Sequence, residues 1–142
     1  MKPEKSYELR YATRFDVDKI KTLLDSNKHT FGFIPRPAIS KSIADAELIV
    51  ATPINNAQNP IAFCRFHKRK DPITTVYEIF VKPEYQNQGI GKRLIKGLKP
   101  PIQAKCPAHL PSNEFYQKIG FTLTETLPGK HKELNLWIKY PT

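Results

Sequence analysis

The segment that decides the fold is Val81-Lys82-Pro83-Glu84-Tyr85-Gln86-Asn87-Gln88-Gly89-Ile90-Gly91-Lys92-Arg93. It predicts the end of a strand, a turn, and the start of a helix that carries two glycines. Glycine lets the backbone approach a ligand closely, so the N–H groups of residues 88–92 can donate to an anion there. The helix dipole, Lys92 and Arg93 add positive potential at the same place. The segment therefore predicts a site for a pyrophosphate.

The spacing of the glycines excludes two common phosphate motifs. A P-loop needs G-x-x-x-x-G-K-[ST], whereas Gly91-Lys92 lacks both the upstream glycine and the following hydroxyl. A dinucleotide fingerprint needs a third glycine where Leu94 stands, and a larger parallel sheet than this chain can supply. What remains is Gln86-x-x-Gly89-x-Gly91, which alone is too short to define a class of protein.

The residues before this segment predict a series of short elements. Alternating residues 7–12 favour a half-buried strand, and Asp16 is expected to cap a helix whose apolar positions begin at Val17. The aromatic and proline-rich residues 31–37 favour a loop, and a short helix is expected to follow it. Residues 48–51 and 61–66 predict a hairpin, and the β-branched run 74–81 predicts a further strand that ends before Pro83.

The residues after it complete an α+β fold. Residues 89–99 carry apolar side chains on one face and predict an amphipathic helix that Pro100-Pro101 ends. A short strand over 102–106 follows, then a helix capped by Ser112 and ended by Gly120, and then strands over 121–127 and 133–140. The predicted order is β-α-α-β-β-β-α-β-α-β-β. This order describes one domain over residues 1–142, with a mixed sheet flanked by helices.

Composition and charge limit the class of partner. The chain has 142 residues and a net charge of +10, which favours anionic partners such as phosphates and nucleic acid. Its basic residues gather in 65–70, 92–105 and 130–132, and runs of this kind are usually solvated faces. No apolar run is long enough for a membrane span, and the N-terminus lacks a secretory signal. With two distant cysteines, these features predict a cytoplasmic protein with reduced thiols.

A second motif places the chain beside a known family. The stretch Asn113-Glu114-Phe115-Tyr116-Gln117-Lys118-Ile119-Gly120-Phe121 puts a helical Phe-Tyr pair before a Gly-Phe strand entry. Together with Gln86-x-x-Gly89-x-Gly91 and the opening residues 9–16, it resembles the GCN5-related N-acetyltransferase (GNAT) family over nearly the whole chain. The chain departs from that family in having glutamine at 86, where arginine is commoner, and in having Asn113 only three residues before Tyr116.

The resemblance implies a role for each part of the site. It implies acetyl-coenzyme A as co-substrate, with its pyrophosphate on the backbone of the turn and its pantetheine arm along the strand 79–81. The backbone N–H of Val81 would then face the thioester oxygen. The coenzyme-binding residues implied are Ile79, Phe80, Val81, Gln86, Asn87, Gln88, Gly89, Ile90, Gly91, Lys92, Arg93 and Asn113.

Transfer of an acetyl group to an amine needs a base and an acid. A protonated alkylamine has a pKa of about 10.4, so a base or a water chain must remove a proton. Glu78 stands in mid-strand between apolar neighbours and is the candidate base, or else a solvent-face residue. By resemblance Tyr116 donates a proton to the leaving thiolate; the alternative is that it only packs. Cys64 and Cys106 are expected to be buried thiols, and the four histidines have no metal-ligand spacing.

The sequence therefore predicts an acetyl-coenzyme A-dependent N-acetyltransferase that works by direct attack and without a metal. Its acceptor is an amine that the sequence does not identify. Two alternatives stay open at this point. One is a basic protein that binds or modifies nucleic acid on the same scaffold, and the other is a coenzyme A-binding protein without turnover.

Overall fold

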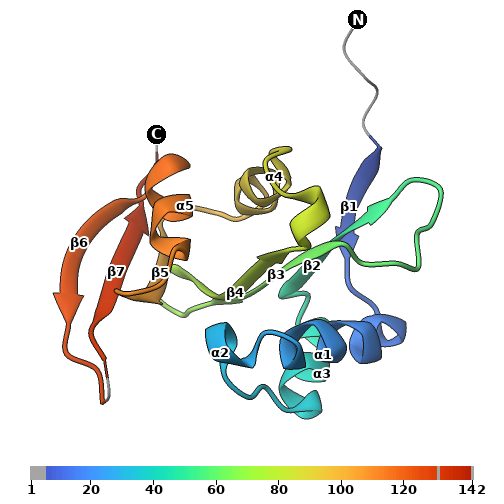
Figure 1. Ribbon diagram of the computed structural model, residues 1–142, viewed down its shortest axis with the longest axis horizontal. Coiled ribbons are helices and arrows are strands. Elements are labelled where there is room, and N and C mark those ends of the chain that lie inside the picture. The colour runs from blue at the N-terminus through green and yellow to red at the C-terminus, as the bar shows by residue number, and fades with distance from the viewer. Residues whose placement is uncertain (1–5, 131, 142) are drawn as a thin grey trace, which may run out of the picture. The chain divides into compact units, whose positions relative to one another are not determined.

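The computed structural model describes residues 6–130 and 132–141, which form two compact units (Figure 1). The first unit holds the described residues up to Phe66 together with Glu78–Gly97. The second holds His67–Tyr77 together with the described residues from Leu98 onward. The hydrogen-bonded strand order is β1-β2-β3-β4-β5-β7-β6, a mixed sheet, and the predicted α+β fold class is confirmed. Each unit is described below by itself, and the single domain over 1–142 stays a prediction.

The first unit is an antiparallel sheet with helices on both faces. Strands β1 (Tyr7–Tyr11), β2 (Leu48–Pro53) and β3 (Ala62–Lys68) pair in that order, with Leu9 opposite Ala51 and Ala51 opposite Ala62. The helices of this unit are α1 (Val17–Asp25), α2 (Lys28–Phe31), α3 (Arg36–Ala44) and α4 (Ile90–Lys96). Figure 1 shows α1, α2 and α3 on one face of these strands and α4 on the other.

The core of the first unit forms where α1 and α3 meet the sheet. Ile20 and Leu24 of α1 lie one helical turn apart on the same face, and both are fully buried. They join Ile39 of α3, Val50 and Phe63 in one apolar cluster. Burial of a side chain of this size stabilises the fold by roughly 1.5–3 kcal/mol, so the cluster holds α1 and α3 against strands β2 and β3.

The start of α1 corrects one expectation. Asp16 occupies the N-cap position of α1, but its side chain makes no cap hydrogen bond to that helix. Instead it closes a capping box with Thr13 around the 3₁₀ turn Arg14–Asp16. Its two oxygens also accept hydrogen bonds from Arg10 at 2.7 and 2.9 Å. The buried carboxylate therefore joins β1 to the first turn, because the guanidinium competes for the oxygens that a helix cap would use.

Replacing Asp16 should reveal this connection as a pH-dependent loss of stability. Burial alone would raise the pKa of Asp16, but the hydrogen bonds from Arg10 and Thr13 outweigh it and hold the pKa below its ordinary value. The resulting stabilisation is present above the unfolded pKa of about 3.9 and is lost as the pH falls through the lower folded pKa. We expect Asp16→Asn to lower the free energy of unfolding by about 1–3 kcal/mol in urea at pH 7, and by less in acid.

The matched control for this prediction is Asp18→Asn. Asp18 also pairs with an arginine, Arg36, but its side chain is 84% exposed. Solvent screens such a pair, so its loss should be nearly neutral. Equal effects of the two substitutions, or an Asp16→Asn effect that does not depend on pH, would contradict the assignment.

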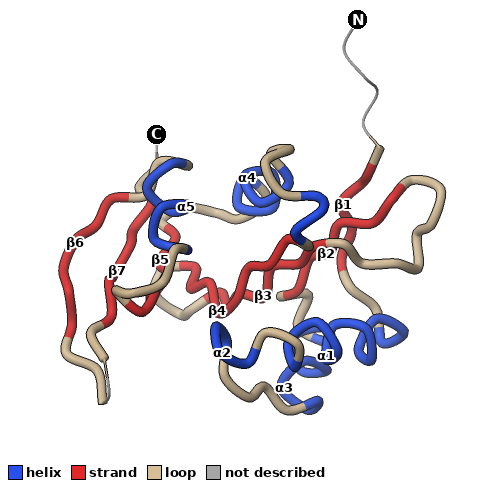
Figure 2. The backbone as a smooth tube through the Cα atoms, viewed as in Figure 1, coloured by secondary structure: helices blue, strands red, loops and turns tan. Residues whose placement is uncertain are grey.

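The second unit is a smaller sheet with one helix. Its strands are β5 (Ile102–Pro107), β7 (Leu134–Lys139) and β6 (Thr122–Leu127), and β7 pairs antiparallel with both of the others. The first residues of β4 (Thr74–Val81) run parallel to β5, with Thr75 beside Gln103. The helix α5 (Ser112–Lys118) stands close to β5 in the sequence and packs on β5 and β6 (Figure 2).

The ends of α5 were predicted with mixed success. Gly120 follows the helix with φ of +99°, the left-handed conformation that the sequence predicted. Ser112, however, is the first helical residue, and the N-cap position is taken by Pro111 without a side-chain hydrogen bond. The predicted serine cap is therefore wrong, because Pro111 already holds the backbone in a helical conformation one residue earlier.

Candidate functional site

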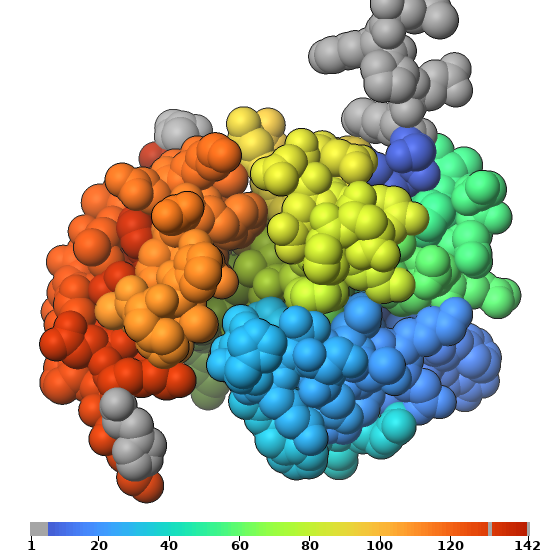
Figure 3. All heavy atoms as spheres, in the orientation of Figure 1, coloured from blue at the N-terminus to red at the C-terminus, as the bar shows by residue number. Residues whose placement is uncertain are grey.

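The segment after β4 forms an exposed turn of unusual backbone conformation. A 3₁₀ turn (Pro83–Tyr85) leads into Asn87 with φ of +65° and Gly89 with φ of +82°, and α4 starts at Ile90. The yellow-green surface in Figure 3 contains this segment, and residues 86–89 are exposed. Among described residues, none accepts a hydrogen bond from the backbone N–H groups of 87–92. These donors are the ones that the first turn of a helix leaves without partners.

The two cations at the start of α4 take different positions. Lys92 is exposed beside the turn. Arg93 instead lies 5.2 Å from the ring of Tyr7 on β1, where its Nη1 is buried and makes no hydrogen bond to the described residues. Of these two cations, Lys92 is therefore the one that stays exposed, while Arg93 packs α4 against β1.

Gln86 closes the turn through its side chain. Its Nε2 donates to the carbonyl oxygen of Val81 at 3.0 Å, and its backbone N–H donates to Pro83 at 3.2 Å. Lys82, next to Val81, donates its backbone N–H to Ile61. The end of β4 and the turn are thus tied together before any ligand arrives, and Gln86 acts within the protein as well as at the predicted binding surface.

The middle of β4 holds one partner of a buried ion pair that the sequence did not predict. Both oxygens of Glu78 accept hydrogen bonds from Arg65, from Nε at 2.7 Å and from Nη2 at 2.8 Å. Arg65 also donates to Ser42 of α3 at 3.2 Å. The two side chains are 10% and 5% exposed. A carboxylate held in this way loses hydrogen bonds when it takes up a proton, so the role of Glu78 as base stays a prediction.

The neighbours of Glu78 on β4 divide between core and surface. Phe80 packs its ring edge against Phe31 and at a tilt against Phe63, with centroid distances of 6.3 and 6.0 Å. Ile79 and Val81 are half-buried. The packing of Phe80 fixes the path of the strand, and any contact of residues 79–81 with a ligand stays a prediction.

The remaining predicted residues, Asn113 and Tyr116, belong to the second unit and lie three residues apart on α5. Asn113 makes hydrogen bonds through both atoms of its amide, to backbone carbonyls and to side chains of β7. Tyr116 is 6% exposed and lies among three aromatic rings. Sequence reasoning placed Asn113 at the coenzyme; its contacts within the protein leave its amide without a spare hydrogen.

The thiols and histidines suggest no further chemistry. Burial, with a contribution from Glu78, raises the pKa of Cys64, and burial raises the pKa of Cys106 to about 11. Both thiols therefore stay protonated at neutral pH and are poor nucleophiles. In the part of the chain that the structure describes, no three histidine, cysteine or acidic side chains gather as metal ligands. No helix there is long and apolar enough to cross a bilayer.

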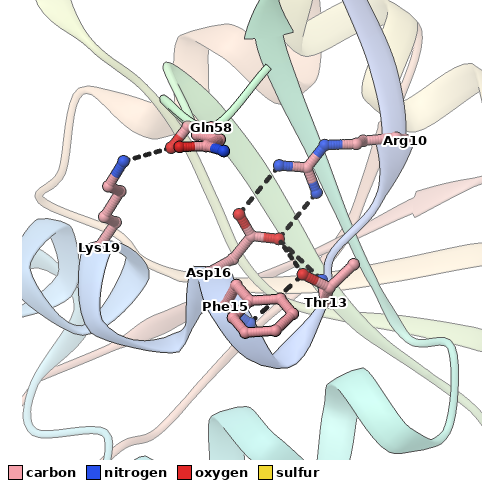
Figure 4. A pocket seen from close by; sticks show the side chains of 6 residues that line it. All are labelled: Arg10, Thr13, Phe15, Asp16, Lys19 and Gln58. Carbon is pink, nitrogen blue, oxygen red and sulfur yellow. Dashed lines mark hydrogen bonds and ion pairs between the residues drawn. The ribbon is translucent and has the colours of Figure 1, made fainter. Parts of the chain in front are cut away.

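A hollow of about 370 Å³ lies elsewhere on the first unit, between β1 and the start of α1 (Figure 4). Its lining includes Arg10, Asp16 and Lys19. Figure 4 shows Arg10 and Asp16 pointing toward each other, and Lys19 pointing toward Gln58. Arg10 donates in addition to the carbonyl of Ala57. These charged groups bind partners within the protein and so connect β1, the start of α1 and the loop that holds residues 57 and 58. The hollow therefore gives no indication of a ligand.

Comparisons with known proteins agree with this architecture. A family model described as "Acetyltransferase (GNAT) domain" matches residues 44–123. Ard1 from Thermoplasma volcanium is similar in structure, with a TM-score of 0.80 at 14% identity over 96% of this chain and 100% of that one. Arabidopsis thaliana NAA60 in complex with a bisubstrate analogue has a TM-score of 0.77 at 14% identity, over 94% of this chain and 97% of that one. Arabidopsis thaliana Naa50 has a TM-score of 0.72 at 17% identity, over 95% of this chain and 99% of that one. No curated protein sequence matches the chain.

The fold and the glycine turn define an acetyltransferase domain. The match covers 80 of the 142 residues, from 44 to 123, and includes β4, the turn, α4 and α5. The chain belongs to the GNAT acetyltransferase family.

Proposed function

We propose that this protein transfers the acetyl group of acetyl-coenzyme A directly to an amine. The observation that supports the proposal most strongly is the set of backbone N–H groups of residues 87–92 that donate to no described residue. A Cβ at Gly89 would meet no atom within 4 Å, so the space beside Gly89 is open. Donors of this kind at a helix start suit a pyrophosphate. NAA60 of Arabidopsis thaliana, which shares the fold, has been solved with acetyl-CoA.

In the proposed complex, each cofactor-binding residue has a limited task. The backbone of residues 87–92 would donate to the pyrophosphate, and Lys92 would add charge there. Gln86 would hold the turn through Val81, and Arg93 would hold α4 through Tyr7. The strand residues Ile79, Phe80 and Val81 would offer backbone groups to the pantetheine arm, with the Val81 N–H toward the thioester oxygen. A fixed donor at that oxygen typically contributes a few kcal/mol to transfer.

The chemistry then needs two proton transfers. The amine nitrogen forms a bond to the acetyl carbon while the carbon–sulfur bond breaks, and the electron pair leaves on sulfur. A proton from the amine passes to Glu78 through water, or to solvent. The thiolate, with a pKa of about 8.5, receives a proton from Tyr116. Because Arg65 engages both oxygens of Glu78, solvent is the stronger candidate for the first step.

The ion pair of Glu78 also favours a second candidate function, coenzyme binding without turnover. Release of free thiol from acetyl-coenzyme A separates the two functions. Suitable acceptors are a peptide with a free α-amino group, L-glutamate and spermidine. Naa50 was solved with the analogue CoA-Ac-MVNAL, and a synthase from Neisseria gonorrhoeae with N-acetyl-glutamate, so the first two have precedent on this fold. Tight binding with no thiol release for any amine would favour the second function.

Tyr116→Phe should separate catalysis from coenzyme binding. If Tyr116 protonates the thiolate, the substitution should lower kcat about 10-fold or more and leave the Kd for acetyl-coenzyme A nearly unchanged. Tyr11→Phe is the control, because Tyr11 is 59% exposed on β1 and has no proposed role. Thiol-release kinetics across pH, with calorimetry for binding, give both quantities. Equal kcat values for Tyr116→Phe and the wild type would mean that the Tyr116 side chain contributes only to packing.

The acceptor should carry a negative group beside its amine or belong to a polyanion. The chain has 23 basic and 13 acidic residues, and a cationic acceptor would meet a positive surface. We propose that residues 31–42 form one wall of the acceptor site. This stretch contains Arg36 and Lys41 and no acidic residue, although the structure pairs these two cations with Asp18 and Asp45. Turnover of an anionic small molecule should fall moderately with salt, and that of a nucleic acid more steeply. Efficient, salt-insensitive acetylation of spermidine alone would contradict this prediction.

A further inference from the structure

An aromatic cluster and one amide surround the proposed acid. Asn113 and Tyr116 are three positions apart in the sequence and therefore lie on the same face of α5. That face meets β7, where Trp137 is 5% exposed. The indole of Trp137 stacks on the Tyr116 ring at 6.4 Å with an angle of 27°. Phe121 and Phe115 meet the same ring edge-on at 5.2 and 5.4 Å. The Tyr116 ring is thus enclosed on several sides within the second unit.

The amide of Asn113 fixes the orientation of the indole. Trp137 Nε1 donates to Asn113 Oδ1 at 2.8 Å, and Asn135 donates to the same oxygen at 3.0 Å. Because an indole N–H can only donate, the atom that faces it must be the oxygen of the amide. The Nδ2 group of Asn113 in turn donates to the carbonyls of Leu110 at 2.7 Å and Pro107 at 2.9 Å, with a longer contact to Ala108 at 3.3 Å.

These bonds connect three elements to one ring. Asn113 joins the end of β5, the segment before α5 and two residues of β7, so its two amide hydrogens and both acceptor sites of its oxygen are engaged. The indole bound to it cannot turn without breaking a buried hydrogen bond. Its stacked partner, Tyr116, is thereby limited to a narrow range of orientations. Proton donation requires a donor within about 2.6–3.2 Å of its acceptor, and small displacements lower the rate strongly.

We propose that Trp137, oriented by Asn113, is a positioning residue that fixes the orientation of the Tyr116 ring within the second unit for the proton donation proposed above. The proposal rests on the proposed function, since it assumes that Tyr116 donates that proton. It assigns Asn113 to the geometry of the acid, whereas the sequence had placed it at the coenzyme. Phe121 is the natural packing control, because it contacts Tyr116 but makes no hydrogen bond with Asn113.

The first part of the test uses fluorescence, because Trp137 is the chain's single tryptophan. Asn113→Leu removes the amide that holds the indole, so quenching by acrylamide should increase at least about threefold. Asn113→Asp keeps an oxygen for Nε1 but loses the donors to the carbonyls of Leu110 and Pro107, so its quenching should lie between those of the wild type and Asn113→Leu. Phe121→Leu should also change little. Unchanged quenching in Asn113→Leu would overturn the proposal at its first step.

The second part measures transfer from acetyl-coenzyme A to hydroxylamine, a small amine that needs no acceptor pocket. Asn113→Leu and Trp137→Phe should each lower kcat about tenfold without altering the Kd for acetyl-coenzyme A, and Asn113→Asp, which keeps only the acceptor for Trp137, should lose less of the rate than Asn113→Leu. In a Tyr116→Phe background, Trp137→Phe should have no further effect, since a positioning residue acts only through the group it positions.

The outcomes distinguish this proposal from the proposed function. A wild type without turnover, or a Tyr116→Phe variant with normal kcat, would overturn the role of Tyr116 and with it the positioning role. A slow Tyr116→Phe variant beside a Trp137→Phe variant of normal kcat would overturn the positioning role alone. If the rate losses of Trp137→Phe and Tyr116→Phe multiply in the double variant, Trp137 does not act through Tyr116. A loss of rate in Phe121→Leu as large as in Trp137→Phe would likewise mean that Trp137 contributes only by packing.

Discussion

Gly89→Leu should abolish binding of acetyl-coenzyme A while the protein remains folded. The position has φ of +82° and open space around a Cβ, so a leucine would project into the volume in front of the exposed N–H groups. Each lost hydrogen bond to a charged phosphate is worth roughly 1.5–3 kcal/mol, and two of them amount to at least about 100-fold in Kd. Calorimetry with acetyl-coenzyme A, and with coenzyme A alone, measures the loss directly.

The chain offers a close control for backbone strain. Gly32 also has a positive φ, +71°, and a Cβ there would likewise meet no atom within 4 Å. Gly89 is left-handed, with ψ of 8°, and a leucine there costs of order 1–3 kcal/mol. Gly32 has ψ of −162°, a conformation that essentially only glycine adopts, so a leucine costs at least as much there. Gly32→Leu should therefore lose at least as much stability as Gly89→Leu, but only Gly89→Leu should lose the coenzyme. Unchanged affinity in a folded Gly89→Leu would remove the turn from the proposed site.

The turn was predictable because its chemistry is local. Two glycines, a preceding strand and a following amphipathic run specify a helix start with exposed N–H groups, and β4 has the predicted bounds Thr74–Val81. The end of α4 was predicted less accurately. The helix was expected to extend to residue 99, but it stops at Lys96, with Gly97 as its C-cap residue. The structure also adds α2, a four-residue helix that is too short to produce a periodic pattern.

Errors arose where a side chain had several partners within reach. Asp16 and Ser112 both precede helical patterns, and both were expected to cap. Asp16 binds Arg10 instead, and Ser112 lies within α5. Local sequence does not reveal that choice, since it depends on which group the fold brings near. Asn113 is a similar case, because its partners in β7 lie more than twenty residues away along the chain.

Arg65 is the most instructive error. It begins a basic run, 65–70, that the sequence assigned to a solvated face, and residues 67–70 are indeed exposed. Arg65 itself belongs to the buried run 61–66 of β3. A signal was present, because Glu78 was already noted as an odd carboxylate in the middle of an apolar strand. A lone cation and a lone anion, each among apolar residues of a predicted strand, indicate a buried ion pair.

That ion pair should make Arg65→Met one of the most destabilising substitutions in the chain. It would leave Glu78 buried without its partner, and breaking a buried pair in this way costs about 3–5 kcal/mol. Exposed Arg69 pairs with Asp71 at the same distance, 2.7 Å, so Arg69→Met is the matched control and should be nearly neutral. Urea unfolding at neutral pH gives both values.

The same substitution should be sensitive to pH in a defined direction. Without Arg65, a charged Glu78 would be buried without a partner, whereas a neutral one would cost less. The cost of Arg65→Met should therefore be smaller in acid than at neutral pH. Adding Glu78→Leu to Arg65→Met removes the orphaned charge and should recover much of the stability.

These experiments also decide whether Glu78 serves as the base. If it does, Glu78→Gln should remove or shift the acidic limb of the pH–rate profile. If the carboxylate is structural, Glu78→Gln should lower stability and leave that limb in place, because solvent takes the proton. An Arg65→Met variant no less stable than Arg69→Met would mean that water already reaches Glu78. The carboxylate would then be accessible enough for the catalytic role that its ion pair now argues against.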